Sequence, residues 1–376
     1  MTKTIVVLGA GHGGVHLSHY MLSLKAQFPD LKVIMVSPTE EFYWNLASIR
    51  VVLPAILRID DTFRSIPKAF SKYPADTFEL ILGTAEHIDA GNDSVTVRLN
   101  SGKTKAVHYH TLIIATGSRA KEHLPWKSLE TSEKTREGIT ALRKRIETAK
   151  SIVVGGAGPT GVELAGELGA AYGKTKAITI VCPGKLPLEG LIEPTRSAAL
   201  KELNKLNVTV KTETKVTKVV DSYGKRVLEL THADSSKTTL EADDFIPTYG
   251  IEYNTEYAPA SWKTNNNRLR VNATQRQPEF ENVFIVGDAA DGQAPTAQKL
   301  MEQMTYVKKQ MPLYMKGEPL ADYVRSDSIG LAIATGPSGG TGQNNSWRLF
   351  SLLVWWFKSR QLGLDVFDKA VNGLNL

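Results

Sequence analysis

The stretch VVGGAGPTGVE at residues 153–163 decides the fold, because it repeats a pattern already present near the start of the chain, IVVLGAGHGG at residues 5–14. In each copy a short β-branched run precedes glycines in the spacing GxGxxG. These glycines are Gly9, Gly11, Gly14, Gly156, Gly158 and Gly161. The first glycine of such a motif permits a tight turn, the second lets the backbone approach a pyrophosphate, and the third lets a helix pack closely on a strand. Two dinucleotide-binding turns are therefore predicted in one chain.

Each turn is flanked by segments that favour a strand–helix–strand unit. The strands are predicted from apolar runs without alternation, which are typical of parallel strands buried on both faces. They are TIVVL at 4–8, LKVIMV at 31–36, SIVV at 151–154 and AITIV at 177–181, with helices at 15–24 and 162–173. In such a unit the helix N-terminus attracts phosphate. The candidate cofactor-binding residues of the two turns are Gly9, Ala10, Gly11, His12, Gly13, Gly14, Gly156, Gly158, Pro159, Thr160 and Gly161.

The residues after the second strand of each unit bear on the adenosine end of the cofactor. An NAD-binding unit usually carries an acidic residue there, which binds the ribose 2′-hydroxyl. Ser37 takes this position in the first unit, which leaves Glu40 or Glu41 in the next loop to reach the ribose. Cys182 takes it in the second unit, and Lys185 follows, where it can attract a 2′-phosphate. We therefore expect NADPH to be accepted at least as well as NADH.

Composition indicates a globular protein with more than one core. The chain has 376 residues, of which 42% are hydrophobic and 22% charged, with a net charge of +6. The basic residues are scattered rather than clustered, so nucleic acid is an unlikely partner, while an anionic membrane surface or an anionic small molecule remains open. No metal site is predicted. The first strand begins almost at the N-terminus, which leaves no room for a cleavable leader, and a cytoplasmic, cytosol-facing protein is expected.

Two further stretches distinguish the first unit from the second. TLIIATGSRA at 111–120 is predicted as a buried strand ending in Ala115, Thr116 and Gly117, and ENVFIVGDAAD at 281–291 as another ending in Gly287 and Asp288. With the glycine turns, these motifs resemble the two-dinucleotide-binding-domain flavoproteins of the glutathione-reductase-like superfamily. The resemblance implies that the first turn and both motifs bind FAD, with Asp288 at the ribityl chain. The second turn would bind NADPH or NADH, and hydride would pass between the two cofactors.

The same resemblance implies an α/β fold with two Rossmann-like dinucleotide-binding domains, in which the NAD(P)H domain is inserted into the FAD domain. The expected segments are 1–122 and 251–325 for the FAD domain, 123–250 for the NAD(P)H domain, and 326–376 for a C-terminal region. Many members of the superfamily pass electrons from flavin to a cysteine pair. Cys182 is the only cysteine of the chain, which excludes that relay. Quinones, molecular oxygen and one-electron proteins are the direct acceptors left open.

The stretch SWRLFSLLVWWFKSR at 346–360 is predicted to form an amphipathic helix. Its polar side would consist of Arg348, Ser351, Lys358 and Ser359, and its apolar side of Leu349, Phe350, Leu353, Trp356 and Phe357. The helix would be too short to span a bilayer. It suits an interfacial membrane anchor, and the alternative is a helix packed on the protein's own core or at a dimer interface.

The whole chain resembles the apoptosis-inducing-factor-like flavoproteins of the ferroptosis suppressor protein type. The segments that carry this resemblance are EFYWNLASIRVVL at 41–53, IVVGGAGPTGVELAGE at 152–167, VGDAA at 286–290, GGTGQ at 339–343 and FKSRQL at 357–362. The family reduces ubiquinone and related quinones at membranes with NAD(P)H and FAD. By this resemblance Arg50 lies at the FAD, Glu163 is required for activity, and Lys358 acts near the flavin or quinone. Type II NADH dehydrogenases are the next nearest relatives.

Three further residues are assigned to cofactor binding. Gln298, in the predicted helix after GDAA, is expected to approach the flavin ring, and Ala85 and Gly250 complete the set. The chain departs from the animal member of the family at its start, Met1-Thr2, where that member has a myristoylated glycine, so membrane attachment would depend on the C-terminal stretch. The mitochondrial outer membrane and the lipid droplet are the membranes considered.

Three functions remain open on these grounds. The favoured one is an FAD-dependent NAD(P)H:quinone oxidoreductase bound peripherally to a membrane, as a monomer or homodimer. The second is a reductase that delivers single electrons to a small iron-sulfur protein, which would not need the aromatic C-terminal stretch. The third is a redox-sensing interaction protein like other relatives of apoptosis-inducing factor.

Overall fold

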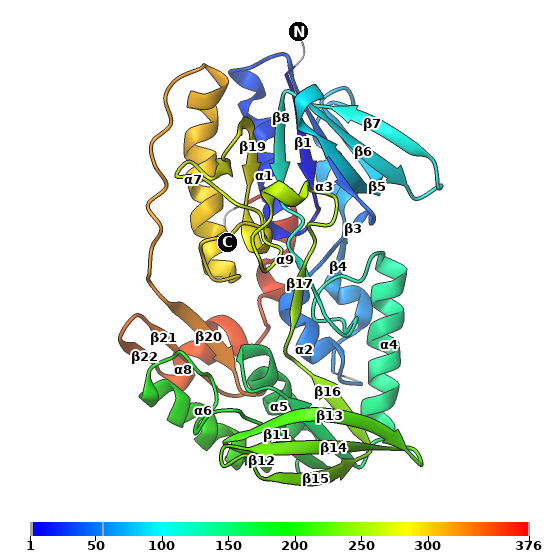
Figure 1. Cartoon of the computed structure of the whole chain (residues 1–376), viewed down its shortest axis with the longest axis vertical. Coiled ribbons are helices and arrows are strands. Elements are labelled where there is room, and N and C mark those ends of the chain that lie inside the picture. The colour runs from blue at the N-terminus through cyan, green and yellow to red at the C-terminus, as the bar shows by residue number, and fades with distance from the viewer. Residues whose placement is uncertain (1–2, 55, 375–376) are drawn as a thin grey trace.

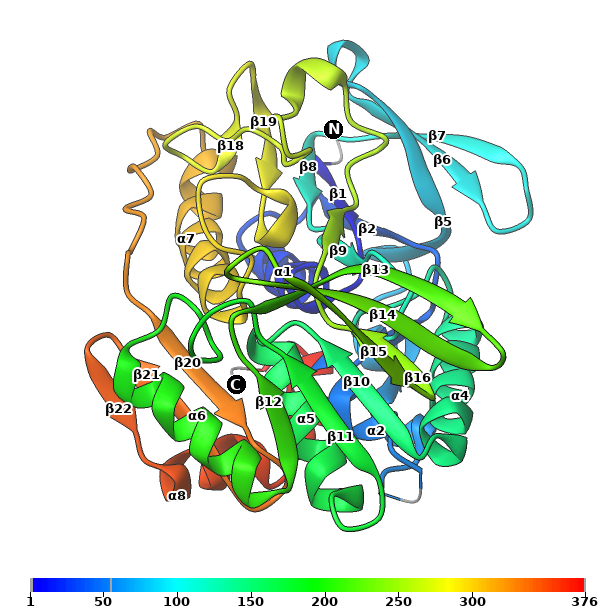
Figure 2. The ribbon, with the colours of Figure 1, turned by 60° about the horizontal axis from the view of Figure 1, so that its bottom comes forward.

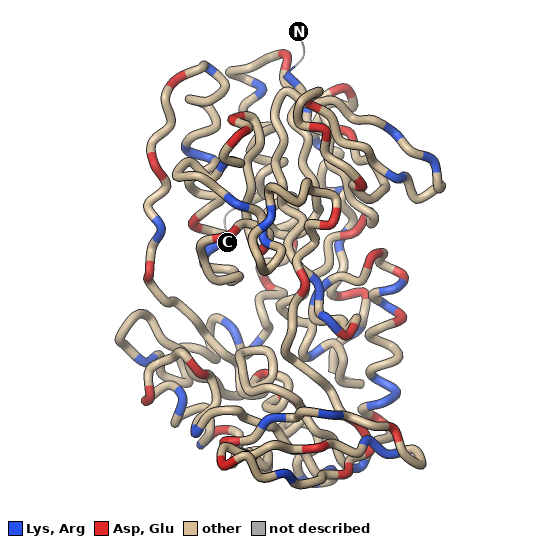
Figure 3. The backbone as a smooth tube through the Cα atoms, in the orientation of Figure 1, with Lys and Arg blue, Asp and Glu red and all other residues tan. Residues whose placement is uncertain are grey.

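The computed structural model describes residues 3–54 and 56–374, which form two lobes, one above the other in Figure 1. Each lobe is built around a β-sheet with parallel strands at its centre. The predicted α/β fold with two Rossmann-like parts is confirmed. Lys and Arg are interspersed with Asp and Glu along both lobes, so the excess positive charge is not collected in one segment (Figure 3).

The sheet of the upper lobe has a parallel centre and antiparallel edges. Its strands in spatial order are β18 (Arg276–Gln277), β19 (Phe280–Ile285), β8 (Thr111–Ile114), β1 (Lys3–Leu8), β2 (Leu31–Ser37), β5 (Phe78–Asp89), β6 (Ser94–Leu99) and β7 (Thr104–His108). Strands β19 to β5 run parallel, and β18, β6 and β7 antiparallel to their neighbours. Ile5 and Val7 of β1 lie in the core that also contains residues of α1 (His12–Ser23), whereas Val6 and Leu8 lie in a second core on the opposite face. Both faces are therefore covered, as the unbroken apolar run of β1 predicts.

The lower lobe repeats this plan on a smaller scale (Figure 2). Its parallel strands in spatial order are β12 (Val208–Lys211), β11 (Ala177–Val181), β10 (Ser151–Gly155) and β16 (Asp244–Pro247). Helices α5 (Pro159–Tyr172) and α6 (Glu193–Lys205) pack on one face. An antiparallel sheet packs on the other face, formed by β13 (Thr214–Ser222), β14 (Lys225–His232) and β15 (Lys237–Ala242). Helix α4 (Ser132–Thr148) flanks the sheet beside β16.

The same topology places each glycine turn at a crevice. Strand β1 lies between β2 and β8, and strand β10 lies between β11 and β16. In each sheet the next strand of the chain pairs on one side of the central strand, and a later strand pairs on its other side. In parallel sheets, ligands bind beyond the carboxyl ends of the strands at such a switch point. Two short strands, β9 (Ser118–Ala120) and β17 (Ile251–Tyr253), pair where the chain crosses between the lobes. The expected boundaries at 122, 250 and 325 remain predictions.

Short elements complete the upper lobe. Strands β3 (Glu41–Tyr43) and β4 (Phe63–Ser65) pair beside helices α2 (Ser48–Val51) and α3 (Ile66–Phe70), and the long helix α7 (Ala297–Met315) packs against α1. From α7 an extended segment descends to the lower lobe, where β20 (Gly330–Ala334), β21 (Gly340–Asn344) and β22 (Trp347–Leu349) form an antiparallel sheet (Figure 1).

The prediction of a single amphipathic helix over 346–360 is wrong. Residues 347–349 form β22, which pairs with 342–344 of β21, and Asn345 makes the turn with a φ of 51°. This pairing satisfies backbone groups that a helix would otherwise have to satisfy. Helix α8 begins only at Ser351 and ends at Val354, and a π-helix follows at Trp355–Ser359. The predicted polar side also fails at Ser359, which is fully buried.

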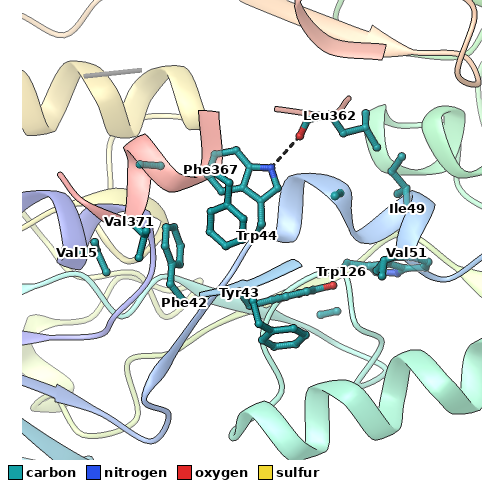
Figure 4. Close-up of a cluster of buried hydrophobic side chains, with 14 of the residues drawn as sticks. Val15, Phe42, Tyr43, Trp44, Ile49, Val51, Trp126, Leu362, Phe367 and Val371 are labelled. Carbon is teal, nitrogen blue, oxygen red and sulfur yellow. Dashed lines mark hydrogen bonds between the residues drawn. The ribbon is translucent and has the colours of Figure 1, made fainter. Parts of the chain in front are cut away.

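The C-terminal region contacts both lobes. Strand β20 packs on α5 below, and helix α9 (Phe367–Val371) packs on α1 above. Between them, the Trp44 indole nitrogen donates a hydrogen bond of 2.8 Å to the carbonyl of Leu362, and the Phe367 ring lies 4.8 Å from that of Trp44 (Figure 4). Residues 362–371 are therefore anchored in the core of the upper lobe.

Candidate functional site

The first glycine turn has the shape that a pyrophosphate needs. Gly9 has a φ of 98°, and a Cβ on Gly14 would lie 1.8 Å from the carbonyl oxygen of Gly9, so α1 approaches β1 as closely as a glycine allows. At Gly11, by contrast, a Cβ would meet nothing within 4 Å. No side chain caps the start of α1 at Gly11. The turn therefore presents helix amide groups and open space together, which fits a phosphate.

The second glycine turn repeats this geometry. Gly156 has a φ of 93°, and a Cβ on Gly161 would lie 2.0 Å from the carbonyl oxygen of Gly156. A Cβ on Gly158 would meet nothing within 4 Å, and no side chain caps α5 there. Pro159 and Thr160 form the first turn of α5, where the absent amide of a proline is tolerated. Both turns therefore fit a dinucleotide by the same test.

His12, within the first turn, is surrounded by aromatic rings. Its ring centroid lies 4.8 Å from that of Phe42 and 5.0 Å from that of Trp44. Burial, reinforced by the neighbouring His16, lowers the pKa of His12 to about 4. The imidazole is therefore neutral at pH 7, and its buried Nε2 has no hydrogen-bond partner among the described residues.

Asp288 lies at the carboxyl end of β19, in a one-turn 3₁₀ helix that begins at Gly287 with a φ of 75°. Its Oδ2 accepts hydrogen bonds from Ser118 Oγ at 2.7 Å and Lys127 Nζ at 2.6 Å. Burial opposes ionisation, but the charge of Lys127 and these hydrogen bonds lower the pKa of Asp288 overall. The carboxylate is thus ionised and fixed on the same edge of the sheet as the first turn. Its predicted contact with the ribityl chain remains a prediction.

The motif at 115–117 closes the first turn from the adjacent strand. A Cβ on Gly9 would lie 2.6 Å from the carbonyl oxygen of Ala115, so the two backbone segments touch. Thr116 Oγ1 donates to the carbonyl of Asn254 at 2.7 Å and contacts the Tyr257 hydroxyl at 2.8 Å. The Thr116 side chain therefore shapes the loop, and any cofactor contact here would come from the backbone. Gly117 has a φ of 64°.

The other predicted cofactor contacts lie further away along the chain. Ala85 lies in β5 opposite Val97, next to a bulge. Gly250 has a φ of 78° and lies beside Lys121 at the crossing between the lobes. Gln298 uses its side chain to bind the backbone amide of Gly330 at 2.6 Å and the Ser328 hydroxyl at 3.0 Å, so it holds the segment before β20. The cofactor roles of these three residues remain predictions.

Neither β2 nor β11 has an acidic residue at its end, since Ser37 is the last residue of β2 and Cys182 directly follows β11. The Ser37 hydroxyl is hydrogen-bonded to the backbone of Thr39. The Arg136 guanidinium donates to both carboxylate oxygens of Glu41, at 2.5 and 2.9 Å. Glu40 is therefore the remaining acidic candidate for the first ribose. Because Glu41 is paired with Arg136, it does not replace the acidic residue that usually binds the ribose after this strand.

After β11, Cys182 is 2% exposed, and its thiol contacts the carbonyl of Gly184 at 3.2 Å. Burial raises the pKa of this thiol. Lys185 is exposed in the following loop, and Arg196 of α6 donates hydrogen bonds to the carbonyls of Leu186 and Pro187. Two cations thus flank this end of the lower sheet, and Arg196 was not predicted.

The two residues predicted to act in catalysis lie in direct contact. Glu163 is in the second turn of α5 and Lys358 is in the π-helix, yet Lys358 Nζ lies 2.5 Å from Glu163 Oε1. Lys358 also donates to the carbonyl of Ala332 at 2.6 Å, and Glu163 Oε1 accepts from the amide of Ala334 at 3.2 Å. Strand β20 therefore holds both members of the pair. Their catalytic roles remain predictions, but the structure brings the pair together.

A second ion pair joins Arg50 of α2 to Glu167 of α5, the helix that also carries Glu163. The guanidinium of Arg50 donates to both carboxylate oxygens of Glu167, at 3.0 and 2.5 Å, and both side chains are buried. Burial raises the pKa of Glu167 and the nearby Glu163 adds to the rise, while Arg50 opposes it. The two-pronged geometry is that of an ionised carboxylate. All these contacts of Arg50 are with protein groups, and its predicted contact with FAD remains a prediction.

Sequence reasoning missed Glu167, Ser118, Lys127 and Arg196. For Glu167 a signal was present, because two acids stand four residues apart in a helix that is otherwise small and apolar, PTGVELAGELGAAY. A charge in such a place needs a partner of opposite sign, and Arg50 in the apolar run ASIRVVL was the obvious candidate. Ser118 and Lys127 meet Asp288 only through the fold, so no local pattern marks them.

Comparison with known proteins defines the class. The chain belongs to the pyridine nucleotide-disulphide oxidoreductase family, which matches residues 3–305. This membership confirms that the protein is an oxidoreductase with the predicted cofactor classes, FAD and NADH or NADPH. The disulphide in the family's description has no counterpart within this chain, because Cys182 is its one cysteine.

Individual relatives extend over nearly the whole chain. Oxidoreductase ptaL of Pestalotiopsis fici is 33% identical over 99% of both chains. Ferroptosis suppressor protein 1 of Taeniopygia guttata is 25% identical over 95% of this chain and 93% of its own, and demethylphylloquinone reductase NdbB of Synechocystis is 25% identical over 89% and 85%. The resemblance to the ferroptosis suppressor type is thereby confirmed. The structure of NDH2 from Plasmodium falciparum in complex with NADH shares the fold, with a TM-score of 0.79, 14% identity and 98% coverage of both chains.

Proposed function

We propose that the protein is an FAD-dependent NAD(P)H:quinone oxidoreductase that works at a membrane surface. The observation that carries the proposal is the place of its lone cysteine. Cys182 is buried in the lower lobe at the end of β11, so the chain offers no thiol pair to take electrons from a flavin. Electrons therefore leave the flavin directly. The name of the Synechocystis relative, a demethylphylloquinone reductase, supports a quinone as the acceptor.

The residues present fit both cofactors. FAD would be held by the first turn, by the backbone at 115–117 and by Asp288, and the nicotinamide cofactor by the second turn. When bound, FAD takes a hydride from the nicotinamide and passes two electrons to the acceptor. The protein contributes orientation above all, because hydride transfer depends on distance and alignment.

Protons must be supplied as well, and the pair of Glu163 and Lys358 is suited to supply them. Quinone reduction consumes two protons in addition to two electrons. The carbonyl of Ala332 and the carboxylate of Glu163 hold the ammonium group of Lys358 in a fixed position. The Lys358 side chain is 23% exposed, so an acceptor can reach it. We assign to Lys358 Nζ the hydrogen bond or proton toward the acceptor, and to Glu163 the role of holding that ammonium group in position.

The membrane contact would be made by an exposed apolar surface of the C-terminal region, named here the aromatic surface. It consists of Trp347, Phe350, Leu352, Leu353, Trp356 and Phe357. Trp347 is 79% exposed and Leu352 is 75% exposed. Large apolar side chains gathered in this way mark an interaction site, and tryptophan favours the depth of lipid headgroups.

Basic groups border the aromatic surface. Arg348 lies 5.5 Å from the Phe350 ring and Arg360 lies 5.4 Å from the Trp356 ring. In the part of the chain that the structure describes, no helix is long and apolar enough to cross a bilayer. The proposed attachment is therefore interfacial, through the β22–α8 corner and the π-helix, to a cytosol-facing membrane or lipid droplet.

Absorbance and kinetics test the activity. The purified protein is expected to be yellow and to oxidise NADPH or NADH rapidly with a short-chain ubiquinone. A rate no greater than the background with oxygen alone would overturn the quinone assignment. Rapid reduction of a small iron-sulfur protein in the same assay would favour the one-electron reductase instead.

Vesicle binding tests the attachment. The triple variant Trp347→Ser, Phe350→Ser, Trp356→Ser is expected to lose sedimentation with phospholipid vesicles and turnover of a long-chain quinone embedded in them, while it keeps activity with the short-chain quinone. Tyr223→Ser is the matched control, because Tyr223 is an exposed aromatic residue between β13 and β14 of the lower lobe. Equal vesicle binding by the triple variant and the control would contradict the proposed surface.

A further inference from the structure

The buried pair of Arg50 and Glu167 is not explained by cofactor binding. Arg50 is the third residue of α2 in the upper lobe, and Glu167 is one turn beyond Glu163 on α5 in the lower lobe. The two side chains are 7% and 1% exposed. Removing two charges from water is costly, and a buried pair is weak evidence of stabilisation by itself. A buried pair of this kind can instead specify how the segments that it joins are arranged, here α2 and α5.

The remaining donors of Arg50 show which segment that is. Nη2 donates to the carbonyl of Ser359 at 2.7 Å, and Nη1 donates to the carbonyl of Arg360 at 3.1 Å. These carbonyls lie at the end of the π-helix Trp355–Ser359. The last carbonyls of a helix lack hydrogen-bond donors within the helix. Here the guanidinium of Arg50, from the upper lobe, donates to them. Arg50 thus joins α2, α5 and the C-terminal region at one point.

Lys358 is the residue immediately before those two carbonyls. Its Nζ meets Glu163 Oε1, and the carbonyl of Leu362 a little further on is held by the Trp44 indole. Helix α5 therefore makes two connections to the same segment. Glu163 binds the side chain of Lys358 directly, and Glu167 binds the backbone behind it through Arg50.

We infer that Arg50 and Glu167 are positioning residues, which fix the π-helix so that Lys358 meets Glu163 at the reaction site. The inference rests on the proposed function, in which Lys358 serves the acceptor. It differs from a direct role at FAD, because Arg50 acts through the backbone at 359 and 360. A guanidinium is required, since an ammonium group cannot span both oxygens of Glu167 and two carbonyls in fixed directions.

The test is a double-mutant cycle on the FAD-loaded protein. Arg50→Lys is expected to lower kcat with short-chain ubiquinone by about tenfold while flavin reduction by NADPH in a stopped-flow experiment changes by less than about twofold. In the Lys358→Met background the same Arg50→Lys change is expected to have almost no further effect on kcat, because the group that it positions is gone. Glu167→Gln should follow Arg50→Lys in both backgrounds.

A second readout does not depend on turnover. Hydrogen exchange of the FAD-loaded protein should become faster at residues 355–362 in Arg50→Lys and stay unchanged elsewhere in the C-terminal region. Arg143→Lys is the matched control. Arg143 of α4 also donates to two carbonyls, those of Val51 and Leu57, but has no contact with the π-helix among the described residues. It is expected to leave both readouts as in the parent protein.

Three results would overturn the inference. They are an equal loss of kcat from Arg50→Lys in the parent and Lys358→Met backgrounds, release of flavin from Arg50→Lys, and unchanged exchange at 355–362. Should the single variants fail to fold, Arg50→Met with Glu167→Met removes both buried charges and is expected to fold and to show the same loss. Failure of the parent protein to reduce any quinone would refute the proposed function alone, since the exchange measurement still decides whether Arg50 holds the segment.

Discussion

The two glycine turns have nearly the same backbone and different surroundings. Behind the upper turn stand the aromatic rings of Phe42 and Trp44, with neutral His12 between them and α9 packed on the helix that follows. Behind the lower turn, α5 carries two carboxylates, one paired with Arg50 of the upper lobe and the other with Lys358 of the C-terminal region. In the proposed function the two turns bind the phosphates of their cofactors in the same way. The surroundings of the turns would then distinguish the enclosed FAD from the nicotinamide cofactor, which must enter, react and leave.

The largest effect should come from closing each turn. Gly14→Ala places a methyl group 1.8 Å from the Gly9 carbonyl, and Gly161→Ala places one 2.0 Å from that of Gly156. Overlap with backbone cannot be relieved by a side-chain rotation, so each change should destabilise its lobe by about 3 kcal/mol or more. Gly14→Ala is expected to yield colourless protein, and Gly161→Ala yellow protein that NADPH no longer reduces. Absorbance before and after addition of NADPH checks both.

The matched controls separate steric damage from cofactor loss. At Gly11 and Gly158 a methyl group meets nothing within 4 Å, so Gly11→Ala and Gly158→Ala should leave the melting temperature of the flavin-free protein unchanged. Gly11→Ala should still weaken FAD binding, and Gly158→Ala should still raise the KM for NADPH. The reverse assignment, with flavin lost from the Gly158 variant, would mean that the two turns have exchanged roles.

The next effect concerns the upper site alone. Asp288→Asn removes the charge that holds Lys127 and Ser118, and the dissociation constant of FAD is expected to rise by tenfold or more, about 1.4 kcal/mol. Ser118→Ala removes one neutral hydrogen bond and should have a smaller effect. Equilibrium dialysis with FAD measures both. The KM for NADPH should stay unchanged, and an increase in it would show that Asp288 serves the lower site.

The lower site should show its own selectivity. Lys185 is exposed beside the end of β11, where Cys182 replaces the usual acid. Lys185→Ala is expected to raise the KM for NADPH by about tenfold and to leave the KM for NADH within about twofold. Lys201→Ala, on α6, is the control for a lost surface charge. A parent protein that prefers NADH by more than about tenfold would contradict the expectation at once.

The last effect is a pH dependence of stability in the upper lobe, away from both turns. His19 of α1 stacks on Phe70 and binds Tyr73 and the Val371 carbonyl, and burial lowers its pKa to about 4. Between pH 6.5 and 4 the unfolded chain takes up a proton that the folded protein refuses, so the free energy of unfolding falls by up to about 1.4 kcal/mol per pH unit.

Urea denaturation at pH 7.5 and 5 measures this loss. His19→Gln should lose less stability between the two pH values than the parent protein, and the exposed His87→Gln should behave as the parent does. A remaining slope is expected from His12 and His16, whose pKa values burial also lowers. Identical slopes for all three proteins would show that His19 does not contribute.

The sequence was informative where the determinant is local. In each unit the strand, the glycine turn and the helix lie within about twenty residues. The close contacts that require glycine are made within this short segment, so both units could be predicted from the sequence. Glu163 and Lys358 were named singly from a resemblance, while their contact depends on β20 bringing distant segments together. The predicted helix over 346–360 was wrong because the glycine-containing strand β21, which ends at Asn344 just before it, pairs with residues 347–349. Amphipathic periodicity does not report such a pairing.

The hydrogen bonds from Arg50 to the carbonyls of Ser359 and Arg360 have a consequence for how this sequence can vary. At residues 359 and 360 the guanidinium binds main-chain oxygens, and these hydrogen bonds do not depend on the side chains of those two residues. If the proposed membrane contact and the proposed role of Lys358 hold, residue 360 can therefore change with the lipid surface without a change in the position of Lys358. Adaptation of the outer surface and constancy of the inner site become separable within three consecutive residues.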